Sequence, residues 1–215
     1  MPVTVDELVV ADPPGLWARL GFRVDGDGCD IGAVRVRLAG ADAGKRVSAW
    51  SLRGIETTDL DGLATTISVT PERAPAPAHP NGASGIDHVV AFCPDLERAV
   101  ARLQAAGLDL RRVREEPTPA GAPRQAFFRL GEVILECIQM PDSPELDRSR
   151  SARLWGLAVR TRDMEQTAAV LGDLLGEPRD AVQEGRTIAT LRRDAGSTVP
   201  LAFMTPGPSR EAVAR

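Results

Sequence analysis

The clearest pattern of hydrophobic and polar positions lies in the middle of the chain. The stretch GIDHVVAF, residues 85–92, has the β-branched content of a strand. It is followed by PDLERAVARLQAAGL, residues 94–108, in which Leu96, Val100 and Leu103 recur at close to helical spacing. The Pro-Asp start and the late glycine of this second stretch suit the two ends of a helix. The pattern therefore predicts a strand followed by a helix.

Three further strands are predicted after this helix. Residues 109–116, DLRRVREE, alternate between polar and apolar positions. RQAFFRL at 124–130 and VILECIQM at 133–140 are separated only by Gly-Glu, which is a short hairpin signal. The predicted order in this unit is strand, helix, strand, strand, strand.

The same order recurs towards the C-terminus. ARLWGLAV at 152–159 is typical of a strand, and DMEQTAAVLGDLLG at 163–176 is typical of a helix. Residues 178–206 then read as three short strands separated by turns. Asp95 aligns with Asp163 at the helix starts, so the chain repeats itself at a period of roughly 65 residues.

A more degenerate third copy opens the chain. VTVDELVV at 3–10 is the predicted strand, and PPGLWARLGF at 13–22 is a shortened helix. RVDGDG, DIGAVRVRL and KRVSAWSLRG are then predicted as its three remaining strands. The chain is therefore divided into a degenerate N-terminal unit (1–56), a Pro/Thr/Ala-rich connector (57–83), a central unit (84–141), a C-terminal unit (152–206) and a tail (207–215).

Composition narrows the choice of partners and compartment. The net charge of −4 gives no basic surface, so we expect no nucleic-acid partner. No segment approaches the length of apolar chain that crosses a bilayer, and the N-terminus lacks the basic start of a signal peptide, so we expect no membrane partner. The three cysteines have no CxxC spacing and are expected to stay reduced in the cytoplasm. The strong preference for arginine over lysine suggests a GC-rich bacterial genome.

These repeated units, opening with GIDHVV and closing with RLGEVILECIQ, resemble the vicinal-oxygen-chelate superfamily. That group includes glyoxalase I, extradiol dioxygenases and bleomycin-resistance-type binding proteins. The resemblance is strong over roughly residues 84–206 and weaker over 3–55. It implies an α+β fold of βαβββ units, two of which curve together into an open eight-stranded cup. It also implies that a ligand or metal lies on the concave face, with metal ligands on the first and last strands of each unit.

The resemblance gives His88 and Glu136 the two ligand positions of the central unit. Glu136 lies in an apolar strand, where a carboxylate is costly to bury unless it is paired or bound to a cation. Imidazole nitrogen with carboxylate oxygen suits one divalent ion, Zn, Fe, Mn or Ni. The hairpin register predicts that Gln125 and Phe127 share the face of Glu136. The alternatives are a structural or surface histidine and a carboxylate that reaches solvent from an edge strand.

The two remaining units give different answers about a metal. In the C-terminal unit, Gly156 aligns with His88 and Leu201 with Glu136, and neither can bind a metal. A cup built from the central and C-terminal units would thus hold two ligands, whereas catalytic zinc sites usually have three protein ligands. Such a cup could instead bind an organic molecule without metal.

A cup built from the N-terminal and central units would hold a third ligand. Glu7 aligns with His88, and Trp50 falls where Glu136 stands, as a flat aromatic wall. Glu7, His88 and Glu136 would then provide one nitrogen and two oxygens for a catalytic metal, and Glu7 or Glu136 could move a proton. The alternative for Glu7 is an exposed charge on an edge strand.

Other side chains complete the candidate site. Trp50, Phe127 and Phe128 could enclose an aromatic ligand, and Arg124 could meet an anionic substrate at the mouth of the cup. Trp155 is expected on the opposite face, as packing, and the alternative is that it lines the cup if the register slips by one residue. His79, between prolines in the connector, is expected to be a loop residue.

Two hypotheses for function follow from the resemblance. The first is a glyoxalase- or dioxygenase-like metalloenzyme, a lyase, isomerase or dioxygenase acting on a small substrate. The second is a metal-free protein that binds or sequesters a small molecule, as resistance-type relatives do. The odd number of units suggests a homodimer, in which one unit is partnered by a second chain.

Overall fold

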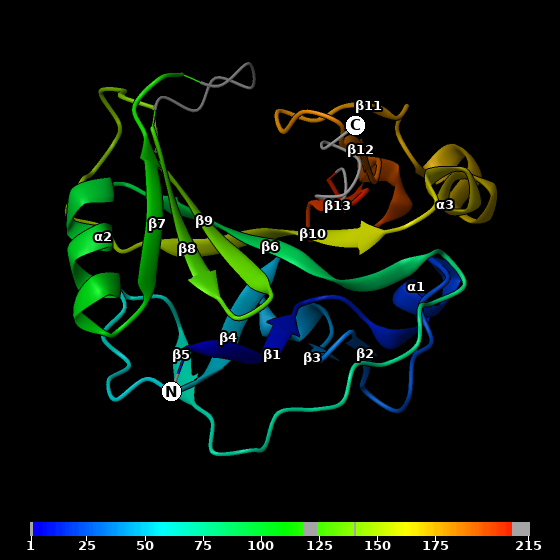
Figure 1. Cartoon of the computed structure of the whole chain (residues 1–215), viewed down its shortest axis with the longest axis horizontal. Helices are drawn as coiled ribbons and strands as arrows, with labels where there is room; N and C mark the ends of the chain where they lie inside the picture. Colours follow the sequence, from blue (N-terminus) through cyan, green and yellow to red (C-terminus); the bar gives the residue numbers. More distant parts are fainter. Residues whose placement is uncertain (1, 118–123, 140, 208–215) are drawn as a thin grey trace, which may run out of the picture.

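The computed structural model of the chain describes residues 2–117, 124–139 and 141–207, and it contains two β-sheets (Figure 1). The first sheet has the strand order β2 (Gly28–Ile31), β3 (Val34–Leu38), β1 (Thr4–Val10), β4 (Val47–Arg53), β5 (Thr65–Ile67). The second has the order β11 (Arg179–Asp180), β12 (Thr187–Thr190), β13 (Leu201–Met204), β10 (Arg153–Thr161), β6 (Ala83–Cys93), β9 (Val133–Gln139), β8 (Gln125–Leu130), β7 (Asp109–Arg114). The helices are α1 (Pro14–Arg19), α2 (Leu96–Ala105) and α3 (Met164–Leu171), with short 3-10 turns η1 (Ala41–Ala43), η2 (Gly172–Leu174) and η3 (Arg193–Ala195).

The second sheet is the predicted eight-stranded cup, and it is built from the central and C-terminal units. Their first strands, β6 and β10, pair antiparallel and join the two units. Figure 1 shows β7–β9 and β11–β13 rising on either side of β6 and β10, so the sheet curves around the face turned away from the first sheet. This confirms the α+β cup. The hypothesis that the N-terminal unit pairs with the central unit to form the cup is wrong.

Local signals in the sequence explain both units of the cup. The side chain of Asp95 accepts a hydrogen bond from the Arg98 amide at the start of α2, and Asp163 does the same for the Gln166 amide of α3. The β8–β9 hairpin turns at Gly131, whose φ of 63° is readily adopted by glycine. Its register places Phe127 opposite Glu136, as predicted.

The first sheet repeats the topology of the cup on a smaller scale. The order β2-β3-β1-β4-β5 matches β8-β9-β6-β10-β13, with the same parallel and antiparallel pairings throughout. β3 therefore corresponds to β9, the last strand of the central unit. β4 corresponds to β10, the first strand of the C-terminal unit. The cause is Gly32, with φ of 63°, which splits the predicted strand 30–38 into the hairpin of β2 and β3. β5, from the connector, completes the sheet.

Each unit carries a β-bulge at the same place in its first strand. The unpaired residue is Asp6 in β1, Asp87 in β6 and Trp155 in β10. A bulge places two successive residues on one face of a sheet, because the extra residue interrupts the alternation of side chains. In β6 the buried residues Ile86 and Val89 therefore flank Asp87 and His88, whose side chains both point away from the core.

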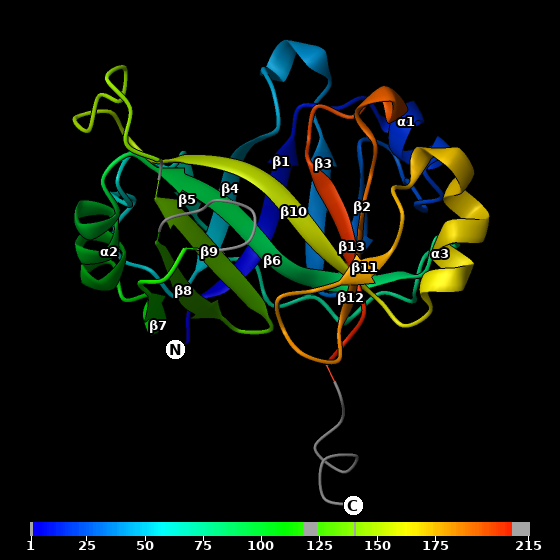
Figure 2. The ribbon, with the colours of Figure 1, turned by 90° about the horizontal axis from the view of Figure 1, so that it is seen from above.

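The core lies between the two sheets. A single cluster of buried apolar residues includes Leu8 and Leu52 of the first sheet and Val89 and Leu157 of the second. Figure 2 shows β6 and β10 running side by side across the molecule over the strands of the first sheet. Each sheet thus has one buried face and one outward face. The homodimer stays a prediction, and the N-terminal unit does not need a partner unit because β4 and β5 occupy those places.

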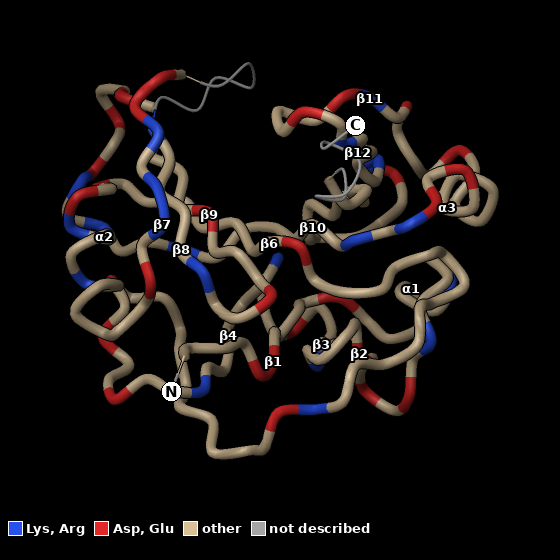
Figure 3. The backbone as a smooth tube through the Cα atoms, in the orientation of Figure 1, with Lys and Arg blue, Asp and Glu red and all other residues tan. Residues whose placement is uncertain are grey.

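Charged residues of both signs are interspersed along the whole described chain (Figure 3). Within the described ranges, no helix has the length and apolar character required to cross a membrane.

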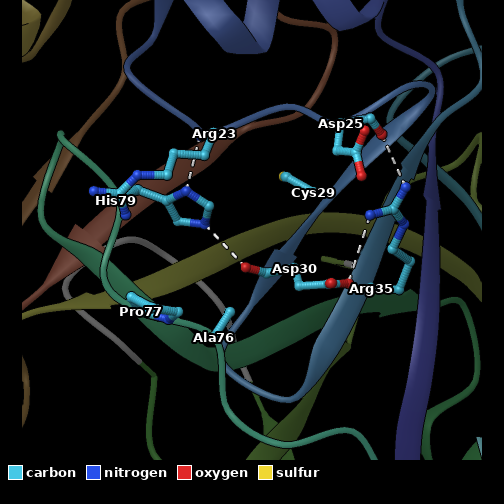
Figure 4. Close-up of a pocket in the computed structure, with 8 residues that line it drawn as sticks. All are labelled: Arg23, Asp25, Cys29, Asp30, Arg35, Ala76, Pro77 and His79. Atoms are coloured by element: carbon cyan, nitrogen blue, oxygen red, sulfur yellow. Dashed lines mark hydrogen bonds and ion pairs between the residues drawn. The ribbon is translucent and has the colours of Figure 1, made fainter.

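His79 joins the connector to the N-terminal unit by hydrogen bonds, although the sequence predicts a simple loop residue. It is only 4% exposed. Its Nδ1 accepts a hydrogen bond from the Arg23 amide at 2.9 Å, and its Nε2 lies 3.1 Å from the Asp30 carbonyl (Figure 4). These partners require a neutral ring with its proton on Nε2. Burial lowers the pKa of His79, although the hydrogen bond to Asp30 acts in the opposite direction.

We expect His79 to make the stability of the protein depend on pH. Its folded-state pKa lies below the unfolded value, so its contribution is complete at neutral pH and is lost as the pH falls through about 6.5 towards the folded pKa. Urea unfolding at pH 7.5 and 5.5 should show a smaller loss of unfolding free energy for His79→Gln than for the wild type. Equal losses in the two proteins would contradict the assignment of a neutral histidine.

Candidate functional site

A chain of polar side chains lies on the outward, concave face of the eight-stranded sheet, which we call the cup face. The bulge in β6 turns both Asp87 and His88 towards this face. Asp87 Oδ2 lies 2.9 Å from His88 Nδ1, and its other oxygen accepts a hydrogen bond from Arg186, which precedes β12. Asp87 therefore fixes the orientation of the imidazole ring and directs its Nε2 away from β10.

Glu136 of β9 lies on the other side of the histidine. Its Oε2 is 3.7 Å from His88 Nε2, and its Oε1 accepts a hydrogen bond from the side chain of Gln125. The two side chains are only 15% and 16% exposed. A separation of 3.7 Å exceeds a normal hydrogen bond, so the two atoms face each other without being joined.

Burial affects the two carboxylates in different ways. Desolvation raises the pKa of Glu136, although His88 and the hydrogen bond from Gln125 act in the opposite direction. For Asp87, burial raises the pKa, but the hydrogen bonds from His88 and Arg186 outweigh burial, so the pKa falls below its ordinary value. Asp87 is thus ionised at neutral pH, while Glu136 retains its proton to a higher pH than an exposed glutamate.

The described residues supply two metal ligands at this place. The strand registers match His88 with Gly156, and Glu136 with Ala202. The sequence comparison of the units matched Leu201 with Glu136. Leu201 is fully buried in the core and lies one residue before Ala202, the equivalent position in the structure. Neither position in the C-terminal unit has a donor. Within the part of the chain that the structure describes, no group of three or more His, Cys, Asp or Glu side chains could hold a metal ion.

Glu7 does not join His88 and Glu136. Its Oε1 pairs with Arg37 Nε at 3.0 Å on the outward face of the first sheet. Sheets that pack face to face are about 10 Å apart, and the whole core lies between Glu7 and His88. The structure thus contradicts a shared metal site for these residues. The registers place Glu7 and Arg37 where the cup has His88 and Glu136, so the N-terminal unit carries an ion pair at that position.

Trp50 is also absent from the cup face. It is 1% exposed and packs in the core between the sheets, with its indole donating a hydrogen bond to the Thr65 hydroxyl at 2.7 Å. The prediction placed Trp50 in a last strand, whereas β3 occupies that place. Trp50 cannot form an aromatic wall for a ligand.

The remaining predicted site residues divide between the cup face and other surroundings. Gln125 and Phe127 lie on the cup face beside Glu136. Phe128 is fully buried in the core, so it cannot contact a ligand. Arg124 forms a salt bridge with Glu115 at 2.6 Å and a longer one with Glu97. The Arg124 guanidinium, which was expected to contact an anionic substrate, is therefore already paired with these two carboxylates.

Sequence reasoning missed Asp87, Arg186 and Phe92, and it placed Trp155 on the cup face only as the alternative of a one-residue register slip. Strict alternation assigns Asp87 and Trp155 to the buried face, and only the bulges turn them outward. Trp155 lies against Phe92, with ring centroids 4.9 Å apart. One repeated feature of the sequence could have indicated the bulge. An aspartate precedes the candidate ligand in two units, as Asp87 before His88 and as Asp6 before Glu7, and both aspartates are bulge residues.

No family model matches the chain, and a sequence search finds no match among curated proteins. Among solved structures, methylmalonyl-CoA epimerase from Mycobacterium tuberculosis superposes with a TM-score of 0.50 at 18% identity, over 65% of this chain and 96% of that chain. A hypothetical protein from Bacillus halodurans gives 0.45 at 19% identity, over 58% and 95%. A variant of the Streptomyces coelicolor epimerase, in complex with 2-nitronate-propionyl-CoA, gives 0.44 at 22% identity, over 57% and 97%.

The likeness to the Mycobacterium tuberculosis epimerase shows the fold alone. Methylmalonyl-CoA epimerase has the glyoxalase-like fold of the vicinal-oxygen-chelate superfamily, and this chain has the same fold. The resemblance seen in the sequence is confirmed at this level.

We expect Glu136→Gln to stabilise the protein at neutral pH. The folded-state pKa of Glu136 is raised, so its contribution is present below the unfolded pKa of about 4.3 and is lost as the pH rises through the folded value. Glutamine keeps the shape and avoids the buried charge. The unfolding free energy of Glu136→Gln should exceed that of the wild type at pH 7.5, and the difference should shrink towards pH 4. A destabilised variant at pH 7.5 would show that the ionised carboxylate is structurally required.

Proposed function

We propose that the chain is a small-molecule-binding protein that holds its ligand on the cup face over His88 and Glu136 without a metal ion. One observation carries this proposal: His88 Nε2 and Glu136 Oε2 face each other at 3.7 Å at the end of an otherwise completed polar chain. Arg186 and Asp87 support one side, and Gln125 supports the other. A ligand atom placed against both groups would complete the hydrogen bonding.

Stability gives no reason for this arrangement. His88 and Glu136 point away from the core, so neither side chain contributes to the packing of the core. Burying a carboxylate that lacks a complete set of partners costs free energy. Charged groups with perturbed pKa values on a concave surface are often retained for binding or catalysis. The pair is therefore best explained by a ligand.

The protonation states favour a ligand hydroxyl. The ionised Asp87 accepts a hydrogen bond from the Nδ1–H group of His88, which leaves Nε2 as the ring nitrogen that faces a ligand. Glu136 accepts a hydrogen bond when ionised and donates one when protonated. A hydroxyl group both donates and accepts, so it suits either form.

The donor set does not fit the metalloenzyme hypothesis. Catalytic zinc sites usually combine three protein ligands with an open position, and among the described residues of the cup the available ligands are His88 and Glu136. Asp87 is already bound to His88 and Arg186. This favours the metal-free alternative, and we place no reaction step on a metal.

A second candidate function is proton transfer, as in an isomerase. The raised pKa of Glu136 beside an oriented histidine is the observation that favours it. A general acid–base works best when its pKa lies near the working pH. In this case Glu136 would exchange a proton with the bound molecule, and His88 would hold the reacting oxygen.

Metal analysis tests the metal-free site directly. Protein purified without a chelator or histidine tag should contain well under one equivalent of Zn, Fe, Mn and Ni, and His88→Ala should not change the content. The physical reason is the missing third ligand. One equivalent of a metal, lost in both His88→Ala and Glu136→Gln but kept in Glu7→Ala, would contradict the proposal.

Ligand binding tests the site itself. In a thermal-shift screen of small hydroxyl compounds confirmed by calorimetry, we expect His88→Ala to weaken binding by about fivefold, because a lost hydrogen bond costs roughly 1 kcal/mol. Glu7→Ala is the matched control, since it removes the equivalent side chain of the N-terminal unit and should leave the affinity unchanged. Equal affinities for the wild type and for His88→Ala would place the ligand elsewhere.

A further inference from the structure

The aromatic residues of the chain are divided sharply between the core and the cup face. The chain has three tryptophans, five phenylalanines and no tyrosine. Five of these eight are at most 4% exposed: Trp17, Trp50, Phe22, Phe128 and Phe203. The other three, Phe92, Phe127 and Trp155, are partly exposed, and the strand registers place all of them on the cup face. Aromatic side chains left partly exposed on a concave surface are suited to ligand contact.

Phe92 and Trp155 form a defined platform at one end of the cup face. Their ring centroids are 4.9 Å apart and their planes are inclined at 46°. Arg153 Cζ lies 5.8 Å from the centre of the Phe92 ring, within the range of a cation–π contact. Trp155 reaches this position only because it is the bulge residue of β10. Its outward orientation is therefore built into the sheet.

Three cavities of about 310, 340 and 540 Å³ are described, and the largest of these three adjoins the platform. This cavity of about 540 Å³ is lined by Phe92 and Arg153, and by a mixed apolar and charged segment after β9 that includes Pro141, Glu145, Leu146 and Asp147. Sites for small organic molecules typically have volumes of about 300–1,000 Å³. The cavity beside the platform has room for a ligand with two fused rings.

The platform and the His88–Glu136 pair can contact a single ligand. Trp155 is followed by Gly156, which pairs with Val90, and Val90 in turn pairs with Glu136. Adjacent strands are about 4.8 Å apart, so two strand spacings, or roughly 10 Å, separate the backbones of Trp155 and Glu136. A two-ring molecule spans this separation, because the side chains shorten it further.

We propose that the platform of Phe92, Trp155 and Arg153 binds the flat ring of an aryl alcohol whose hydroxyl meets His88 and Glu136. This inference rests on the proposed function and names its ligand class. The ring stacks on one of the two aromatic side chains and meets the other edge-on, because their planes are inclined at 46°. The Arg153 guanidinium interacts with the π face of the bound ring. A saturated ligand of the same outline would lack both interactions.

Three probes separate the parts of this proposal. 2-Naphthol has the ring and the hydroxyl, decahydro-2-naphthol keeps the hydroxyl but is not aromatic, and 2-methoxynaphthalene keeps the ring but cannot donate a hydrogen bond. We expect calorimetry to give an affinity for 2-naphthol at least about fivefold higher than for either of the other two, from one aromatic contact or one hydrogen bond.

The indole N–H signals in an NMR spectrum report the position of the ring. Trp17 and Trp50 donate to Asp12 and Thr65 inside the core, so their signals serve as internal references. Addition of 2-naphthol should shift the Trp155 signal, which Trp155→Phe identifies by its loss, and leave the other two unchanged. Shifts confined to Trp17 or Trp50, or no shift at Trp155 despite binding, would overturn the proposal.

Variants test the platform by loss and by rescue. Phe92→Leu and Trp155→Leu should each weaken 2-naphthol binding about fivefold to tenfold, and Trp155→Phe should restore most of the loss. Val69→Ala, which alters a side chain that is 95% exposed, is the control for a change in apolar surface. Thermal unfolding checks that each variant is folded. Leucine variants that are folded and bind as well as the wild type would overturn the platform.

The outcomes distinguish this inference from the proposed function. Equal binding of 2-naphthol and its decahydro form, both weakened by His88→Ala, would overturn the platform and leave the function standing. Binding of 2-naphthol that depends on Trp155 but not on His88, Glu136 or the free hydroxyl would overturn the function and keep the aromatic site. No binding of any of the three probes would overturn the platform.

Discussion

β6 and β10 pair antiparallel along their whole length, and this ladder determines what the cup can present. It joins the central and C-terminal units, and its inner face carries Val89 and Leu157 into the core. The same ladder contains the bulges at Asp87 in β6 and at Trp155 in β10, which turn these two side chains outward. The polar pair and the aromatic platform therefore depend on the same hydrogen-bonded framework, and their relative positions are fixed by it.

Packing of the first sheet on the inner face of the cup has a direct chemical consequence. Both sheets must bury one face, so the outward faces of the two sheets are on opposite sides of the core. Glu7 and His88 occupy equivalent positions in their units and yet cannot approach one another. The constraint that stabilises the molecule thus keeps Glu7 away from the cup face, where the described metal-ligating side chains, His88 and Glu136, both come from the central unit.

Much of the fold could be predicted from the sequence, because helical spacing, capping aspartates and hairpin glycines act locally. The pairing of Phe127 with Glu136 followed from a two-residue turn. The role of β3 could not be predicted, since Gly32 divides a stretch that reads as one strand. Asp87 was missed, and Trp155 was placed outward only as an alternative, for a related reason: a bulge breaks alternation without leaving a clear mark in the sequence. The candidate site was thus predicted for His88, Glu136, Gln125 and Phe127, but not for the residues that hold or flank them.

The three units use one backbone geometry for three kinds of chemistry. At the matching pair of positions the N-terminal unit has Glu7 with Arg37, the central unit has His88 with Glu136, and the C-terminal unit has Gly156 with Ala202. The first is an ion pair at 3.0 Å, which satisfies its own charges. The last has no polar side chain to satisfy. Only the central pair is buried, close and still incompletely hydrogen-bonded, and a bound molecule is what would complete it.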